Sequence, residues 1–237
     1  MKPGEACLAV VPARGGSKRI HRKNLRCLEG KPLLAHTVEA ALHSGIFNRV
    51  IVTTDDPETA EVARRCGAEV PFLRDPGLAD DYVPVSAATV DALQRLDPSG
   101  GAFAHVCQLM PNCPLRTAGD ILDSHAQFVH TGADSQLSVV RYGWQNPWWA
   151  MRRDERFLLE PLFENALTQR SQDLPELFCP TGAVWWARSA ALLREGTYHM
   201  ASRTGWEIPW TRGIDIDTED DWSMAEILVR TAERGRE

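Results

Sequence analysis

The stretch Ala6-Cys-Leu-Ala-Val-Val-Pro-Ala-Arg-Gly-Gly-Ser-Lys-Arg-Ile-His-Arg-Lys-Asn24 joins a short apolar run to a basic loop with two adjacent glycines. Its first part, Ala6–Pro12, predicts a strand buried on both faces, because successive positions are apolar rather than alternate ones. The loop follows that strand directly. In an open parallel sheet, ligands bind beyond the carboxyl ends of the strands, and this loop occupies such a place.

The chain up to Arg141 continues as an alternation of strands and helices. Strands alternating with helices of about ten or more residues predict an α/β fold, a three-layer arrangement in which helices cover both faces of a mostly parallel sheet. The predicted strands are Arg49–Thr54, Ala68–Leu73, Ala104–Met110 and Asp134–Val140, and the predicted helices are Pro32–Ser44, Pro57–Cys66, Val85–Leu96 and Thr117–His130.

The alternation stops after Arg141. From Trp144 to Trp210 the chain is irregular and rich in Pro, and it holds seven of the eight Trp. We interpret 143–180 as an excursion from the sheet, within a single domain over 1–237. The Trp side chains could form a dimer contact or fill the core of an extended subdomain. The chain is then predicted to return in the strands Gly182–Trp186 and Gly213–Ile216 and the closing helix Glu219–Glu233.

Composition excludes several classes of protein. With 237 residues, 43% hydrophobic and 24% charged, the chain can form a real core and is not disordered. A net charge of −6 argues against a nucleic-acid binder. No apolar run reaches about 18 residues, and Ala6–Val11 is too short for a signal peptide, so we expect no membrane segment and a cytoplasmic location. The six cysteines form no C-x-x-C pair, which disfavours a disulfide framework or a zinc site.

The basic loop has the chemistry of a phosphate site. Gly15 and Gly16 allow close backbone approach, so that their N–H groups can face phosphate oxygens. Arg14 and Lys18 add positive charge, and the Ser17 hydroxyl can donate a hydrogen bond. Five Lys and Arg within one segment of an acidic protein favour a polyphosphate ligand. The alternative is a solvated basic loop, since neither a P-loop nor a G-x-G-x-x-G motif is present.

A pair of carboxylates near the end of the chain has the pattern of a metal site. Asp215 and Asp217 point to one side of the strand predicted there, because side chains alternate along a strand. Two carboxylates on one side suit Mg²⁺. In the alternative, Asp217 is the N-cap of the closing helix, and Asp220 completes a mimic of a capping box.

Polar residues at other predicted strand ends are further candidates. Arg74 could bind a base carbonyl or a phosphate, or could be a surface residue of a turn. Asn112 and Arg116 stand on a loop stiffened by two prolines. In the excursion, Arg170 and Gln172 could bind an acidic, polyhydroxylated ligand. Arg170 could equally pair with Asp173 or Glu176.

Taken together, these motifs resemble the CMP-sialic acid synthetase (acylneuraminate cytidylyltransferase) family. The resemblance runs from about residue 6 to 230 and keeps the order and spacing of the motifs. It rests on Pro12-Ala-Arg-Gly-Gly-Ser-Lys-Arg-Ile20 with Lys23-Asn24, Thr53-Thr-Asp-Asp56, Phe72-Leu-Arg74 with Leu78-Ala-Asp-Asp81, Pro111-Asn-Cys-Pro-Leu-Arg116, Arg170-Ser-Gln-Asp-Leu-Pro175 with Pro180-Thr-Gly-Ala183, and Asp215-Ile-Asp217-Thr218.

The resemblance implies a nucleotide-diphospho-sugar transferase-like fold and a nucleotidyltransferase. In that family, CTP and a nine-carbon 2-keto sugar acid give a CMP-sugar and pyrophosphate with Mg²⁺. The family is usually dimeric and exchanges an inserted segment between subunits, which fits 143–180. By its motifs the resemblance assigns the triphosphate to Arg14, Ser17 and Lys18, other nucleotide contacts to Asn24 and Arg74, the metal to Asp215 and Asp217, and the sugar site to Arg170.

The sequence departs from the family around the sugar site. The family commonly has Gln directly before the Pro-x-x-Pro-Leu-Arg motif, and here that residue is Met110. Gln108, two residues earlier, faces the same way along the strand. With Asn112 and Gln172, Gln108 is a candidate for binding the substrate. The Arg170–Pro175 motif resembles the pseudaminic acid branch more than the neuraminic branch.

The resulting hypothesis is an in-line attack of the sugar's 2-hydroxyl on the α-phosphate of CTP. Arg14 and Lys18 hold the triphosphate and the leaving pyrophosphate, and Mg²⁺ on Asp215 and Asp217 polarises the α-phosphate. Three alternatives stay open: a cytidylyltransferase for 3-deoxy-octulosonic acid or another acid, a sugar-transferring enzyme that uses Asp-x-Asp, and a non-enzymatic nucleotide-sensing protein.

Overall fold

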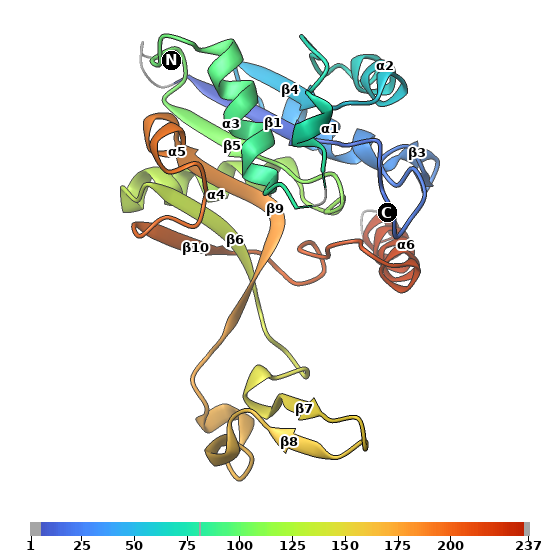
Figure 1. Cartoon of the computed structure of the whole chain (residues 1–237), viewed down its shortest axis with the longest axis vertical. Helices are drawn as coiled ribbons and strands as arrows, with labels where there is room; N and C mark the ends of the chain where they lie inside the picture. The colour runs from blue at the N-terminus through green and yellow to red at the C-terminus, as the bar shows by residue number, and fades with distance from the viewer. Residues whose placement is uncertain (1–5, 81, 235–237) are drawn as a thin grey trace.

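The computed structural model describes residues 6–80 and 82–234 and has an α/β architecture (Figure 1). Helices are α1 (Leu33–Ser44), α2 (Pro57–Arg65), α3 (Val85–Leu96), α4 (Ala118–Thr131), α5 (Ser189–Glu195) and α6 (Glu219–Arg234). Strands are β1 (Cys7–Pro12), β2 (Cys27–Leu28), β3 (Lys31–Pro32), β4 (Arg49–Thr53), β5 (His105–Gln108), β6 (Ser135–Arg141), β7 (Met151–Arg153), β8 (Leu159–Pro161), β9 (Phe178–Arg188) and β10 (Arg203–Glu207).

The central sheet has the strand order β10-β6-β9-β5-β1-β4. β1 pairs in parallel with β4 and β5, and β10 pairs in parallel with β6. β9 is antiparallel to both of its neighbours, β5 and β6. The prediction of a mostly parallel sheet is therefore confirmed.

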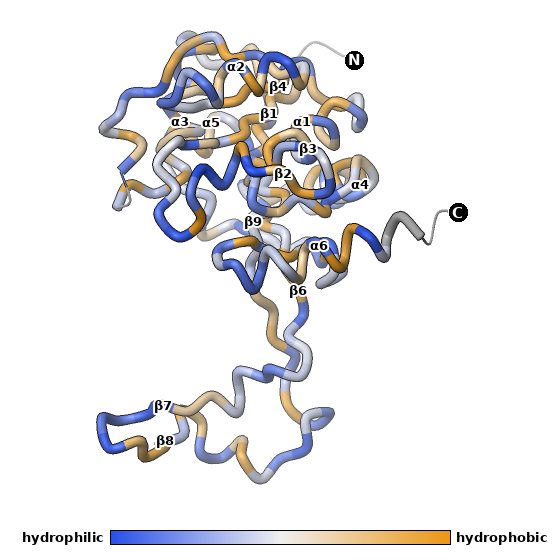
Figure 2. Tube along the Cα trace, turned by 90° about the vertical axis from the view of Figure 1, so that its right-hand side faces the viewer, coloured by the Kyte–Doolittle hydropathy of each residue, from blue (hydrophilic) through white to orange (hydrophobic). Residues whose placement is uncertain are grey.

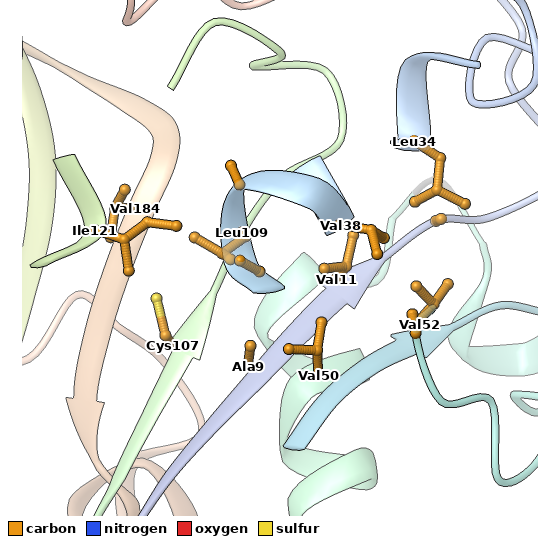
Figure 3. Packing of buried hydrophobic residues seen from close by; sticks show 14 of the residues in the cluster. Ala9, Val11, Leu34, Val38, Val50, Val52, Cys107, Leu109, Ile121 and Val184 are labelled. Carbon is orange, nitrogen blue, oxygen red and sulfur yellow. The ribbon is translucent and has the colours of Figure 1, made fainter. Parts of the chain in front are cut away.

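Both faces of the sheet are covered, as the continuous apolar run in β1 predicts. Alternate residues of β1 enter two different cores: Val11 packs with α1 and α4, whereas Val10 packs with α3 and α5. Figure 3 shows the first of these cores, with Leu34 and Val38 of α1 above the sheet. Because the core is built around β1, the loop that leaves the end of β1 has a rigid base.

Two predicted strands are absent from the structure. Segment 68–73 makes a single bridge, between Glu69 and Ile51, because Pro71 has no N–H with which to continue a ladder. Residues 213–216 run as an irregular segment, in which the amide of Ile216 donates to the carbonyl of Asn112 at 2.8 Å. The parallel position beside β6 is taken instead by β10, a strand that the sequence did not predict.

The excursion leaves the main body on the long strands β6 and β9 and carries the small β7–β8 sheet (Figures 1 and 2). Of the seven Trp between 144 and 210, only Trp144, Trp148 and Trp149 lie in 143–180. Trp186 is buried in the main core, where its ring stacks on Phe47. The excursion is therefore less Trp-rich than the sequence pattern indicated. Many of its large apolar side chains are nevertheless exposed, including Phe157, Leu158 and Leu159.

No helix in the described ranges is both long and apolar enough to span a membrane. Within the described part of the chain, none of the six cysteines forms a disulfide.

Candidate active site

The C-terminal helix packs against the segment that follows β1. One face of α6, with Trp222 and Ala225, packs on Ile20 and Leu28 of the segment that follows β1. Ile216, just before α6, is buried in the same apolar cluster. The basic loop and the Asp215–Asp217 pair are therefore held side by side, although about two hundred residues separate them in the sequence.

A cavity of about 370 Å³ lies between these segments, beyond the carboxyl ends of β1 and β5. Most of the residues predicted to bind the nucleotide and the metal line it. The lining residues include Arg14, Ser17, Lys18, Arg19, Lys23, Asn24, Arg74, Met110, Asn112, Asp215 and Asp217.

Cations of the basic loop hold the carboxylate of Asp217 directly. Lys23 Nζ lies 3.1 Å from Asp217 Oδ1 and donates to the Ile216 carbonyl at 2.6 Å. The guanidinium of Arg19 lies 3.1 Å from Asp217 Oδ2. The sequence predicts no separate role for Lys23 and Arg19, which are two of the five cations of the basic loop.

The alternative in which Asp217 caps the closing helix is wrong. Thr218 accepts the amide of Asp221 at 3.3 Å, and the Asp221 carboxylate accepts the amides of Asp217 and Thr218. Thr218 and Asp221 therefore cap the start of α6, and Asp220 does not take the role predicted for it. The Asp217 carboxylate is left to face the cavity.

Asp215 is the more buried carboxylate of the pair. Burial, followed by the charge of Asp217, raises the pKa of Asp215 to about 6, against the opposing effects of Lys23 and Arg116. Asn112 donates to its Oδ1 through the side-chain amide. A cation bound beside Asp215 would favour the ionised form of this carboxylate.

The oxygen atoms in this corner fit a hard cation. Asp215 and Asp217 line one cavity, and the Oδ1 atom of Asn112 beside them is buried without a hydrogen-bond partner. Carboxylate and amide oxygens are the ligand type that Mg²⁺ takes, usually with one or two carboxylates and several waters. The residues present therefore fit the predicted Mg²⁺.

The basic loop is fixed at its beginning by Asp55 and Asp56, which lie between β4 and α2. The amide of Gly15 donates to Asp55 Oδ1 at 3.0 Å, so it is engaged within the protein, contrary to the expectation that it faces a phosphate. A Cβ atom at Gly15 would lie 2.7 Å from Cβ of Asp56, which explains the glycine. The side-chain Nδ2 of Asn24 donates to the carbonyl of Arg14 at 2.9 Å, and this hydrogen bond closes the loop. Asn24 thus shapes the loop as well as lining the cavity.

Arg74 is a buried cation at the wall of the cavity. Only 4% of the residue is exposed, and its Nε and one terminal nitrogen have no hydrogen-bond partner. Burial lowers the pKa of its guanidinium, with Asp55 as the main opposing influence at 3.7 Å. Unsatisfied buried donors are costly, so the site is arranged for an acceptor supplied by a ligand. The alternative of a surface arginine in a turn is wrong.

Three predicted substrate-binding residues lie outside this cavity. Gln108 is fully buried, and its Oε1 accepts the Thr89 hydroxyl at 2.7 Å. Arg170 is exposed on the excursion and pairs with Asp173 at 2.8 Å, the intramolecular partner that the sequence allowed. Gln172 is exposed on the same turn. At the family's glutamine position, the side chain of Met110 lines the cavity.

Comparisons with known proteins show the family of the chain. A family model described as "Cytidylyltransferase" matches residues 8–110. The chain is 33% identical over 225 residues to a pseudaminic acid cytidylyltransferase of Campylobacter jejuni, an alignment that covers 94% of this chain and 96% of that protein. It is also 33% identical to a CMP-N,N'-diacetyllegionaminic acid synthase of Legionella pneumophila, with 94% and 95% of the two chains covered. The chain belongs to the CMP-sialic acid synthetase family of cytidylyltransferases.

As a cytidylyltransferase, the protein is an enzyme of the nucleotidyltransferase class. A solved structure of CMP:2-keto-3-deoxy-manno-octonic acid synthetase complexed with CTP has the same fold, with a TM-score of 0.72 at 15% identity over 96% of this chain and all of that one. The predicted nucleotide-diphospho-sugar transferase fold is thereby confirmed. The family resemblance read from the motifs is confirmed as well.

Proposed function

We propose that this cytidylyltransferase couples CTP to a nonulosonic acid, a nine-carbon 2-keto sugar acid, and releases a CMP-sugar and pyrophosphate. The observation that carries the proposal is the convergence of the Arg14–Lys23 loop, Arg74 and the Asp215–Asp217 pair on one cavity. Relatives named for pseudaminic and legionaminic acid, each aligned over almost the whole chain, support this class of sugar.

In this proposal the chain's own residues bind and orient CTP. Arg14, Ser17 and Lys18 hold the triphosphate, with the Gly16 amide as a further donor, and Lys18 stabilises the charge that develops on the leaving pyrophosphate. Arg74 gives its unpartnered donors to the nucleotide. Holding the two reactants in line supplies much of the rate enhancement.

Mg²⁺ is the metal we propose for Asp215 and Asp217. When bound, it would supply Lewis-acid polarisation of a phosphate oxygen. Lys23, whose ammonium group contacts Asp217, keeps that carboxylate aimed at the cavity and screens its repulsion of Asp215.

We also propose that the enzyme is a cytoplasmic homodimer, with 1–237 as one catalytic domain and 143–180 as the dimerisation and sugar-site excursion. A second copy would cover the exposed apolar side chains of the excursion, such as Phe157 and Leu159. It would also bring Arg170 and Gln172 to a cavity that they do not reach within their own chain. No role for nucleic acid is proposed, since the net charge is −6.

The test is mass spectrometry of the products from CTP, Mg²⁺ and a panel of pseudaminic, legionaminic, neuraminic and 3-deoxy-octulosonic acids. We expect a CMP-sugar and pyrophosphate with at least one nonulosonic acid. If only the octulosonic acid is turned over, the proposed substrate class is wrong and that acid takes its place. Tight CTP binding with no product from any acid would favour a nucleotide sensor. Asp215→Asn should abolish product formation, and unchanged turnover of this variant at saturating Mg²⁺ would refute the metal assignment.

A further inference from the structure

A second cluster of reactive side chains lies at the other end of the sheet from the nucleotide cavity. Cys7 is the first residue of β1 and His105 the first of β5, and the two are direct partners in the parallel register of these strands. Register partners on neighbouring parallel strands point to the same face, about 4.8 Å apart. That face is covered by α4, which contributes His125.

The three side chains converge on one point. His105 Nδ1 lies 3.0 Å from His125 Nε2, and Cys7 Sγ lies 3.7 Å from the same His125 nitrogen. Within the ranges 6–80 and 82–234, this is the single group of three His, Cys, Asp or Glu residues whose candidate ligand atoms all lie within 4.8 Å of one another. Three donors around one tetrahedral Zn²⁺ would be ~3.3–3.6 Å apart, as follows from bond lengths of about 2.0–2.3 Å.

The surroundings hold the two imidazoles in place. The His125 ring lies 4.5 Å from the Trp186 ring, and the His105 ring lies 5.1 Å from that of Phe128, both measured between centroids. Desolvation lowers the pKa of both histidines, that of His105 to about 4, and so favours the neutral form of each ring. Neutral imidazoles offer lone pairs to a metal without first losing a proton.

The cluster opens onto a cavity of about 880 Å³, whose wall includes all three residues. Three protein ligands with an accessible fourth position are the arrangement of zinc sites that keep a water or a small ligand on the metal. Arg188 on β9, the register partner of His105, also lines this cavity, and its guanidinium donates to the carbonyls of Gly132 and Ala133.

We propose that Cys7, His105 and His125 form a site for a borderline divalent cation of the zinc class, with its fourth position open to the cavity. Sulfur and imidazole ligands select such a metal and not Mg²⁺, so the site is chemically distinct from the Asp215–Asp217 pair. On binding, Cys7 loses its thiol proton to solvent. The imidazole that donates the hydrogen bond between His105 and His125 releases that proton and takes one up on its other ring nitrogen, so that both facing nitrogens offer lone pairs to the metal. The metal ties β1, β5 and α4 together.

The sequence gives no indication of this site, because its ligands come from three separate elements and form none of the usual zinc spacings. The pairing of β1 with β5 creates it.

The test is a Co²⁺ titration of the full-length protein after chelator treatment, followed by competition with Zn²⁺. We expect about one equivalent of Co²⁺ to produce the thiolate-to-cobalt charge-transfer band, and Zn²⁺ to abolish that band. His105→Gln and His125→Gln should each weaken Zn²⁺ binding by more than about tenfold. His130→Gln, an exposed histidine of the same helix, and Cys27→Ser, an exposed cysteine, should leave it unchanged.

Two further measurements keep the proposal refutable. Asp215→Asn should retain the cobalt band, which would separate the new site from the predicted Mg²⁺ site. His125→Gln should retain Mg²⁺-dependent turnover and a cooperative thermal transition, while losing the Zn²⁺-induced rise in Tm. A native protein that binds Co²⁺ without the thiolate band, or His variants that bind Zn²⁺ as tightly as the native chain, would overturn the assignment.

Discussion

At the scale of single residues, the cavity is shaped by groups that the protein itself leaves unsatisfied or crowded. Arg74 has buried donors without partners, and Gly15 sits where a side chain would collide with Asp56. The unpartnered donors of Arg74 carry a free-energy cost, and Gly15 is the residue that the close approach of Asp56 allows. They make sense as parts of a site that a charged ligand completes, and each leads to a separate prediction.

Replacing Arg74 should weaken nucleotide binding without weakening the fold. In Arg74→Met, a buried cation with incomplete hydrogen bonding becomes apolar, so the Tm should stay the same or rise. The Kd for CTP should rise about 10- to 100-fold, since a charge-assisted hydrogen bond is worth about 1.5–3 kcal/mol. Calorimetric titration and thermal melts measure the two effects. Arg64→Met, at an arginine of α2 that donates to the Val70 carbonyl, is the matched control and should bind CTP normally. If the Tm of this variant falls together with its affinity for CTP, the role of Arg74 is structural.

A methyl group at Gly15 should move the basic loop. The Asp56 Cβ that it would meet cannot give way easily, because the Asp56 carboxylate accepts the amide of Thr59 at 2.9 Å and so caps α2. We expect Gly15→Ala to lower stability by about 1–3 kcal/mol and to reduce CTP affinity, since the Gly15–Asp55 hydrogen bond shifts with the loop. Gly143→Ala, where no atom lies within 4 Å of the added carbon, should cause neither change. Equal behaviour of the two variants would contradict this account.

At the scale of elements, hydrogen bonds at helix ends fix the segments of chain that adjoin those helices. The capping of α6 by Thr218 and Asp221 is one case, because it leaves the preceding Asp217 for the cavity. The turn after α3 is another. There Asp97 accepts the amides of Gly101 and Ala102, both at 2.8 Å, and so fixes the chain that enters β5.

The stability supplied by Asp97 should depend on pH. The amide of Gly101 lowers the pKa of Asp97, with burial opposing it and the amide of Ala102 adding to it. A carboxyl whose folded pKa lies below its unfolded value of about 4 stabilises the fold above that pH and loses this effect as the pH falls through the folded pKa. Asp97→Asn should therefore cost about 1 kcal/mol at pH 7, since a charged acceptor becomes neutral. Melts at pH 7 and pH 3 should show a narrower gap at the lower pH, and a gap that is equal at the two pH values would rule out the charge as its cause.

At the scale of the whole molecule, the excursion extends away from the main body on β6 and β9 (Figure 1). Within residues 6–80 and 82–234, its exposed apolar side chains are left uncovered, and the exposed Arg170 pairs only locally, with Asp173. A dimer with exchanged excursions would satisfy both features.

Mixing two inactive variants tests this exchange. If the excursion of one subunit completes the cavity of the other, a mixed dimer of Asp215→Asn and Arg170→Ala subunits has one cavity with both residues intact. We expect unfolding and refolding of the mixture to regain up to about a quarter of native activity. The reason is that subunits pair at random, and each hybrid dimer has one intact site of its two. The separate variants, refolded alone, are the control. No recovery from a mixture shown by mass to contain hybrid dimers would mean that each excursion serves its own chain.

The sequence alone determined the parallel α/β plan and the chemistry of two segments. Buried strands such as β1 are continuous apolar runs, and helices such as α1 carry a periodic apolar face, so both follow from local pattern. The parallel α/β plan is confirmed, because it depends on residues close together along the chain. The glycines and cations after β1 likewise predict a phosphate-binding loop, which stays a prediction, and the amide of Gly15 is bound by Asp55 within the protein.

Only the tertiary structure decided which distant groups meet. The packing of α6 on Ile20 and Leu28 sets Lys23 against Asp217, and the pairing of β1 with β5 sets Cys7 beside His105. Segment 213–216 was mistaken for a strand for the same reason: its hydrogen bond runs to Asn112, about a hundred residues away. Apolar burial selects such contacts across the whole molecule, and no local pattern of residues encodes them.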